Sequence, residues 1–118
     1  MEIVNLTPHA IAVELSDGRR TFAPSGSIAR VQSTSAVIGS VDGVPVSRAT
    51  LGAVTGLPPA ADGVVYLVSA MVAQAAGRAD VVSPDTGPTA IRENGQVVAV
   101  RGFTAWHREV VEYPLKRL

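Results

Sequence analysis

Three polar residues, Asn5, Thr7 and His9, have the types and the spacing of a small binding or acid–base site. They alternate along the chain, so an extended backbone would project all three side chains to one side. An amide, a hydroxyl and an imidazole on one face can hold a polar ligand, and an imidazole transfers protons near neutral pH. The structural alternative is that Asn5 and Thr7 bond backbone groups around Pro8, which itself disturbs the alternation.

A second group of candidates flanks an apolar segment in the second half of the chain. Ser69 follows one apolar run and Asp85 follows the next. If the two runs are parallel strands, both residues lie at the carboxyl edge of the sheet, where open α/β sheets tend to bind ligands. The alternative is that Ser69 only caps a helix and Asp85 only makes a turn.

Arg78 and Asp80 form a third candidate pair, placed at the opposite edge of the same sheet. The guanidinium group of arginine matches the geometry of phosphate and carboxylate groups, so Arg78 is a candidate for binding an anion. The alternative is a local ion pair at a helix end.

Several kinds of chemistry have no support in the sequence. The chain has no cysteine, which rules out disulfides and thiolate metal sites. It also lacks the HxH and HExxH spacings, the Walker loop, the GxGxxG loop and the GxSxG elbow. We therefore expect no metal and no cofactor, assign no catalytic residue, and keep His9 as the one candidate acid or base.

The elements that position these residues centre on residues 64–83. The run Val64–Val68 is apolar and rich in β-branched residues, which is typical of a strand buried on both faces. Ser69 is a favoured N-cap, the alanine-rich segment Ala70–Ala76 predicts a helix, and Gly77 is a natural C-terminal cap. Because this helix is apolar nearly all round, we expect it to be buried. With the strand Ala79–Ser83, the segment is a candidate βαβ unit.

Short strands and tight turns make up most of the remaining chain. The plainest hairpin joins residues 36–41 to residues 44–49 through Asp42-Gly43, and Asp17-Gly18 and Asn94-Gly95 mark two more. A polar link at residues 33–35 and a loop at residues 50–62 are expected to flank the plainest one. The expected fold class is α+β: a β-hairpin-rich sheet or a small barrel with one short buried helix, folded as a single domain over residues 1–118.

The net charge and the amino-acid composition limit the classes of partner that the protein could bind. Ten basic and ten acidic residues give a net charge of zero, which argues against a nucleic-acid partner bound by bulk electrostatics. The sequence has neither an apolar run long enough to span a membrane nor the pattern of a signal peptide, so we expect a cytoplasmic protein. Hydrophobic residues make up 47% of the chain and charged residues 17%, and so few charges favour a homo-oligomer.

The run NLTPHAI at residues 5–11 resembles the start of a family of short, uncharacterised phage, prophage and actinobacterial proteins with an NLTPHxI motif. The likeness continues at residues 24–30, at Leu57-Pro58 and at residues 66–85. It implies a phage-linked accessory protein and carries no established activity. By analogy, such a protein would capture a small polar, nucleotide-like ligand, in the manner of a counter-defence factor.

Three functions follow, in order of preference. The first is the binding of a small polar or anionic molecule at the Asn5/Thr7/His9 strand and the Ser69–Asp85 edge. The second is a protein-binding module that acts on a host or phage partner. The third is a small enzyme that uses His9 as acid or base.

Overall fold

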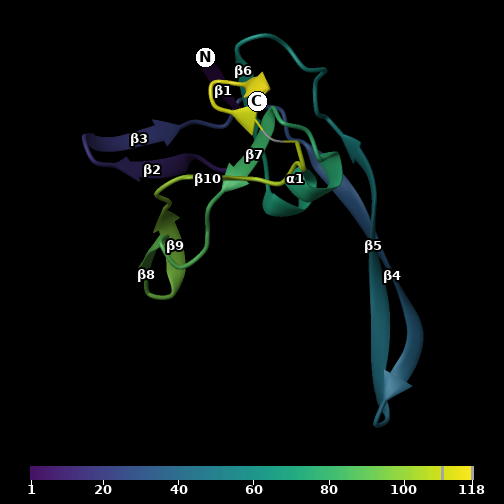
Figure 1. Ribbon diagram of the computed structural model, residues 1–118. Helices are drawn as coiled ribbons and strands as arrows, with labels where there is room; N and C mark the ends of the chain where they lie inside the picture. Colours follow the sequence, from purple (N-terminus) through teal and green to yellow (C-terminus); the bar gives the residue numbers. More distant parts are fainter. Residues whose placement is uncertain (110, 118) are drawn as a thin grey trace.

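The computed structural model describes residues 1–109 and 111–117, and Figure 1 shows the arrangement of its elements. Short strands dominate, and one helix lies between the sixth and seventh of them. In chain order the elements are β1 (Glu2–Asn5), β2 (Ile11–Leu15), β3 (Gly18–Phe22), β4 (Arg30–Val41), β5 (Val44–Thr55), β6 (Val64–Leu67), α1 (Ala70–Ala76), β7 (Val81–Pro84), β8 (Ile91–Glu93), β9 (Gln96–Ala99), β10 (Phe103–Ala105), β11 (Val111–Glu112) and β12 (Lys116–Arg117).

A four-stranded sheet in the order β1-β6-β7-β10 forms the centre of the molecule. Strand β6 pairs in parallel with β1 on one side and with β7 on the other, whereas β10 runs antiparallel to β7. The apolar run predicted to be covered on both faces is β6, and Leu67 and Val68 at its end are fully buried. The prediction of a central buried strand is therefore confirmed.

Helix α1 begins and ends at the predicted residues. The hydroxyl of Ser69 accepts a hydrogen bond from the N–H of Val72 (3.3 Å), and Gly77 adopts the left-handed conformation with φ of 58°. Because α1 joins the parallel strands β6 and β7, the predicted βαβ unit is confirmed.

The expectation that α1 is buried all round is wrong. Only Val72 and Ala73 are buried, and Met71 is half-exposed. The physical reason is that a seven-residue helix lying on one face of a sheet turns only one side to it.

Apolar side chains cover both faces of the central sheet. On the face that carries α1, Tyr66 and Val68 pack with Leu6, Val72 and Val81. On the other face, the buried set is Val65, Leu67 and Val82, against which Phe22 and Phe103 pack. The core thus lies in two thin layers around β6.

The remaining described strands form two-stranded hairpins that stay separate from the central sheet. The fold is broadly α+β as expected, but the small barrel is wrong because the sheets do not close. A four-stranded sheet is too short to curl onto itself, and each hairpin is held by its own turn. No helix in the described residues has the length and apolar character needed to cross a bilayer.

The β4–β5 hairpin, which we call the arm (residues 30–55), projects away from the rest of the molecule (Figure 1). The Asp42-Gly43 turn lies where the sequence predicts it, with φ of 50° and 77° at the two residues. The predicted polar link at 33–35 and the loop starting at residue 50 are wrong, because the strands continue through both. A register shift between Val31 and Ser33 lets the pairing pass Gly52.

Candidate functional site

The parallel strands bring three of the predicted segments to one edge of the sheet. Strands β1, β6 and β7 end at the same side, so the turn after Asn5, the Ser69 cap and the turn at Asp85 all lie at the carboxyl edge. Arg78 and Asp80 precede β7 and therefore lie at the opposite edge, as predicted.

The side chain of Asn5 holds the turn that follows β1. Its Nδ2 donates to the carbonyl oxygens of His9 (2.8 Å) and Phe22 (2.9 Å). Its Oδ1 accepts from the backbone N–H of Thr7 (2.9 Å) and lies 2.7 Å from the Thr7 hydroxyl. Asn5 is 2% exposed and Thr7 is also buried. The polar atoms of both residues are thus committed to the fold, and they tie β1 to the end of β3.

His9 stands apart from its two predicted companions. Its backbone takes part in the turn, because its carbonyl accepts from Asn5 and its N–H lies 3.4 Å from the Thr7 hydroxyl. The residue is exposed. The turn at Pro8 interrupts the extended backbone, so the side chains of Asn5, Thr7 and His9 do not alternate on one face. This is the disturbance that a proline at position 8 predicts.

Ser69 and Asp85 each make the local contact that the alternative predicted. Ser69 caps α1, and the carboxylate of Asp85 accepts from the N–H of Gly87 (3.0 Å), which closes a small turn. Ser83, just before this turn, is fully buried and receives a hydrogen bond from the indole N–H of Trp106 (2.9 Å).

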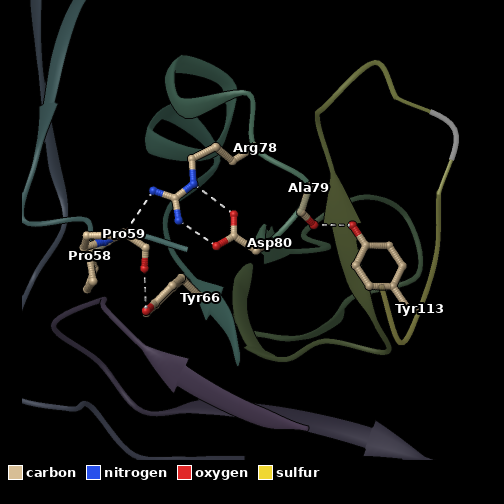
Figure 2. A network of polar contacts seen from close by, with 7 residues as sticks. All are labelled: Pro58, Pro59, Tyr66, Arg78, Ala79, Asp80 and Tyr113. Atoms are coloured by element: carbon tan, nitrogen blue, oxygen red, sulfur yellow. Dashed lines mark hydrogen bonds and ion pairs between the residues drawn. The ribbon is translucent and has the colours of Figure 1, made fainter. Parts of the chain in front are cut away.

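Arg78 and Asp80 form a two-pronged ion pair, drawn in Figure 2. The Nε and Nη2 groups of Arg78 donate to the two carboxylate oxygens of Asp80 at 2.9 and 2.6 Å. Nη1 donates to the carbonyl oxygen of Pro58 (2.9 Å), and the guanidinium lies 6.0 Å from the ring centre of Tyr66. The hydrogen bond to Asp80 is the main reason that the pKa of Arg78 is raised above its ordinary value.

Two tyrosines brace the same region (Figure 2). The hydroxyl of Tyr66 donates to the carbonyl oxygen of Pro59 (3.3 Å), and that of Tyr113 donates to the carbonyl oxygen of Ala79 (2.8 Å). Burial, and then the nearby charge of Asp80, raise the pKa of Tyr113 above its usual value. Tyr113 thereby ties the C-terminal segment to the residue between Arg78 and Asp80.

A cavity of about 400 Å³ opens beside this cluster. Its walls combine polar and apolar residues: Ala60, Gly77, Arg78, Ala79, Asp80, Glu109, Val111 and Leu115. Because Arg78 is already paired with Asp80, its charge is largely compensated here. The arrangement suits a neutral polar group better than a strongly anionic one.

A second cavity, which we call the base groove, lies where the arm joins the body. Its volume is about 430 Å³, and apolar side chains line most of it. The lining residues are Leu6, Pro8, Ile28, Ala29, Arg30, Val31, Gln32, Thr55, Ser69, Met71 and Val72.

The arm is the surface that the sequence analysis did not single out. Val37, Ile38, Val41 and Val44 are all more than half exposed. Two signals pointed to it: the β-branched residues flanking the Asp-Gly turn, and the scarcity of charges, which are limited to Arg30, Asp42 and Arg48 over residues 30–55. A sequence pattern that predicts a strand does not predict whether each face of that strand packs on a core or contacts solvent. The exposure of the arm therefore could not be predicted from the sequence.

In the part of the chain that the structure describes, no three acidic, histidine or cysteine residues gather closely enough to hold a metal ion. A scan against protein-family models finds no match, and searches of the curated proteins and of the solved structures find no significant similarity. The functional conclusion therefore depends on the geometry described above.

Proposed function

We propose that the protein is a protein-binding module whose working surface is the arm. The observation that carries the proposal is the exposure of Val37, Ile38, Val41 and Val44 on a ribbon that projects from the body (Figure 1). Val41 and Val44 form a cross-strand pair on one face of the ribbon, and exposed apolar side chains that gather on a surface mark interaction sites in folded proteins. Isolated two-stranded ribbons are also marginally stable in water, so a partner that covers the arm would stabilise it.

The arm suits strand addition to a protein partner. Both of its strands have an outer edge whose backbone N–H and C=O groups can pair with an added strand. Its three charges and the zero net charge of the chain offer little electrostatic attraction for a nucleic acid. The resemblance to phage and prophage proteins suggests that the partner is encoded by a phage or by its host.

Shortening the arm is expected to leave the body folded. Replacing residues 35–49 by Asn-Gly keeps the paired residues Thr34 and Thr50 next to a two-residue turn. The core residues Ala29, Val31 and Val54 all lie outside the deletion. We expect the melting temperature, measured by circular dichroism, to change by no more than about 5 °C. A loss of cooperative unfolding would show that the deleted part of the arm is needed for the body to fold.

Photo-crosslinking in native cells tests the binding itself. A photoreactive side chain at position 46, on the arm, is expected to give a discrete protein adduct. The matched control at Thr21 places the same group on an exposed strand of the β2–β3 hairpin, and we expect no adduct there. Equal labelling from both positions, or none from position 46, would contradict the proposal.

A second candidate function has one specific observation in its favour. The cavity beside Arg78 is large enough for a small molecule and has the guanidinium and carboxylate of the ion pair in its wall. We propose that, if the protein also binds a small polar or nucleotide-like ligand, this cavity is the site. Calorimetry against uncharged nucleosides, with cyclic and ADP-ribose-type nucleotides as the charged comparison, should show tighter binding of the nucleosides, and Arg78→Met should abolish it. Binding that survives this change would place the ligand elsewhere, and no binding by any member of the panel would count against the candidate.

A further inference from the structure

The two outer edges of the arm differ in how well they are protected against pairing with another strand. Asp42-Gly43 is a two-residue turn with positive φ at both positions, so Val41 and Val44 form a hydrogen-bonded pair. The next pair, Ser40 and Pro45, is then a non-hydrogen-bonded pair, in which the backbone N–H and C=O groups of both residues point away from the partner strand of the hairpin. Pro45 therefore removes a donor from the outer edge of β5.

The β4 edge lacks this protection. No proline and no charged residue occurs between Val31 and Val41, whereas β5 carries Pro45 and Arg48. The β2–β3 hairpin has two arginines on β3, and β8 contains Arg92 and Glu93. Charged residues and prolines of this kind usually protect the edge strands of natural proteins against pairing with a strand of another chain. Register shifts occur along β4 between Val31 and Ser33 and between Val37 and Gly39, which leaves Ser33–Val37 as a regular run.

We propose that the partner of the arm is a second copy of this chain, paired β4 to β4 in antiparallel orientation about a two-fold axis near Ser35. This inference rests on the proposed function and names its partner. Alternation along β5 from Pro45 points the N–H of Ala49 outward, and Ala49 pairs with Ser35. The backbone of Ser35 thus faces the open edge, and two arms would join into one four-stranded ribbon.

The length of the arm brings the tip of each copy to the base groove of the other copy. Antiparallel pairing centred on residue 35 places Val41, six residues towards the tip, opposite Ala29 of the second copy, within one residue because of the register shifts. Ala29 lines the base groove, but it is buried and its N–H already donates to the carbonyl oxygen of Leu6 (3.0 Å). The backbone pairing of the two copies therefore stops before residue 29, and Val41 would meet the groove through its side chain. Val41, Val44 and Val46 lie on one face of the tip, so the apolar tip of each copy would reach the apolar groove of the other.

A stable dimer needs these tip contacts because strand pairing alone buries too little surface. A 12-residue strand is about 40 Å long, and an edge about 10 Å deep buries roughly 400 Å² per copy. A stable interface buries about 800 Å² per partner. The tip-in-groove contact, made twice by symmetry, supplies the remaining apolar area, and a two-fold arrangement closes so that assembly stops at the dimer.

Proline and cysteine variants test the proposal on the full-length chain. Sedimentation should give a dimer of the 12.2 kDa chain at micromolar concentration. Ser35→Pro removes an outward donor from β4 and should give a monomer. Ser47→Pro removes the equivalent donor from β5 and should leave the dimer intact. Because the chain has no cysteine, Ser35→Cys should form an intermolecular disulfide on oxidation, whereas Ser47→Cys, on the far strand, should not.

The outcomes separate this inference from the proposed function. A wild-type protein that stays monomeric, or equal disulfide formation at positions 35 and 47, overturns the self-pairing. If the photoreactive group at position 46 still gives an adduct of another mass, the arm binds a different protein and the proposed function stands. If neither position 46 nor Ser35→Cys gives an adduct, both fail. Should Ser35→Pro fail to fold, the cysteine pair decides alone.

Discussion

Asn5→Ala is expected to destabilise the protein by about 3–5 kcal/mol, which is a large part of the total stability of a small domain. The reason is that one buried amide serves groups from three places: the Thr7 N–H and hydroxyl, the His9 carbonyl and the Phe22 carbonyl. Removing it takes the side-chain acceptor from the Thr7 N–H and the amide donor from the Phe22 carbonyl, while the Thr7 hydroxyl and the His9 carbonyl keep only their contact with each other (3.0 Å). The cost is high because Asn5 is almost fully buried. Urea unfolding followed by circular dichroism measures the change.

Two further variants separate this structural role from ligand binding. Asn5→Asp keeps the acceptor for Thr7 but turns an oxygen towards the carbonyls of His9 and Phe22, so we expect nearly the same loss. Gln74→Ala removes an exposed amide from α1 and should change stability by less than about 0.5 kcal/mol. If Asn5→Ala unfolded at the wild-type urea concentration, the amide would be free for a ligand, and the structural account of the turn would be wrong.

The central unit could be predicted because its signals are local and agree with one another. Ser69, the alanine-rich segment and Gly77 define both ends of α1, and they act through hydrogen bonds within a few residues. The apolar run of β6 requires cover on both faces, which only a strand inside a sheet obtains. Consistent local preferences therefore identified the βαβ unit before any tertiary contact was known.

The arm could not be predicted in the same way. Its alternating residues suit a half-buried strand as well as an exposed ribbon, because alternation records two faces and not what covers them. The residues at Ser33–Ser35 and at Gly52 also have a weak preference for strands. They are part of β4 and β5 because each strand pairs with the other through this region. Thr7 and His9 show the same limit: their spacing implies a shared face only while the backbone stays extended, and Pro8 turns it.

The sequence indicates that Arg78 and Asp80 can form a local ion pair, and the structure shows this pair, but the sequence does not indicate the hydrogen bond from Arg78 to Pro58. The link from Arg78 to Pro58 spans twenty residues, and no local pattern in the sequence indicates that the carbonyl of Pro58 lies beside Arg78. Long-range bonds of this kind depend on the assembled fold. They are nevertheless the contacts that make this pair more than a local one.

Removing the carboxylate of Asp80 is therefore expected to cost far more than breaking a surface ion pair. The side chain of Asp80 is 8% exposed and that of Arg78 is 30% exposed. Asp80→Asn leaves the guanidinium partly buried without its counter-charge, and we expect a loss of about 2–3 kcal/mol, below the 3–5 kcal/mol of a fully buried pair because Arg78 can still reach water. Urea unfolding at pH 7 gives the value.

The matched control is the ion pair between Arg19 and Glu14, whose 2.7 Å contact on an exposed hairpin is similar in length to the 2.6 Å contact between Arg78 and Asp80. Glu14→Gln should cost no more than about 1 kcal/mol. A double-mutant cycle then isolates the Arg78–Asp80 interaction. Arg78→Met combined with Asp80→Asn should be less destabilising than the sum of the two single changes by about 1–3 kcal/mol, because the double variant leaves no unpaired charge in this partly buried place.

The same variants also test whether the Arg78–Asp80 ion pair keeps the shape of the cavity beside it. Arg78 joins the turn between α1 and β7 to the loop before β6 through Pro58, so Asp80→Asn should speed hydrogen exchange at residues 57–63 as well as lower global stability. Glu14→Gln should leave exchange in that loop unchanged. Additive single changes with unaltered exchange would mean that Arg78 and Asp80 do not brace the loop, and that the cavity keeps its shape without them.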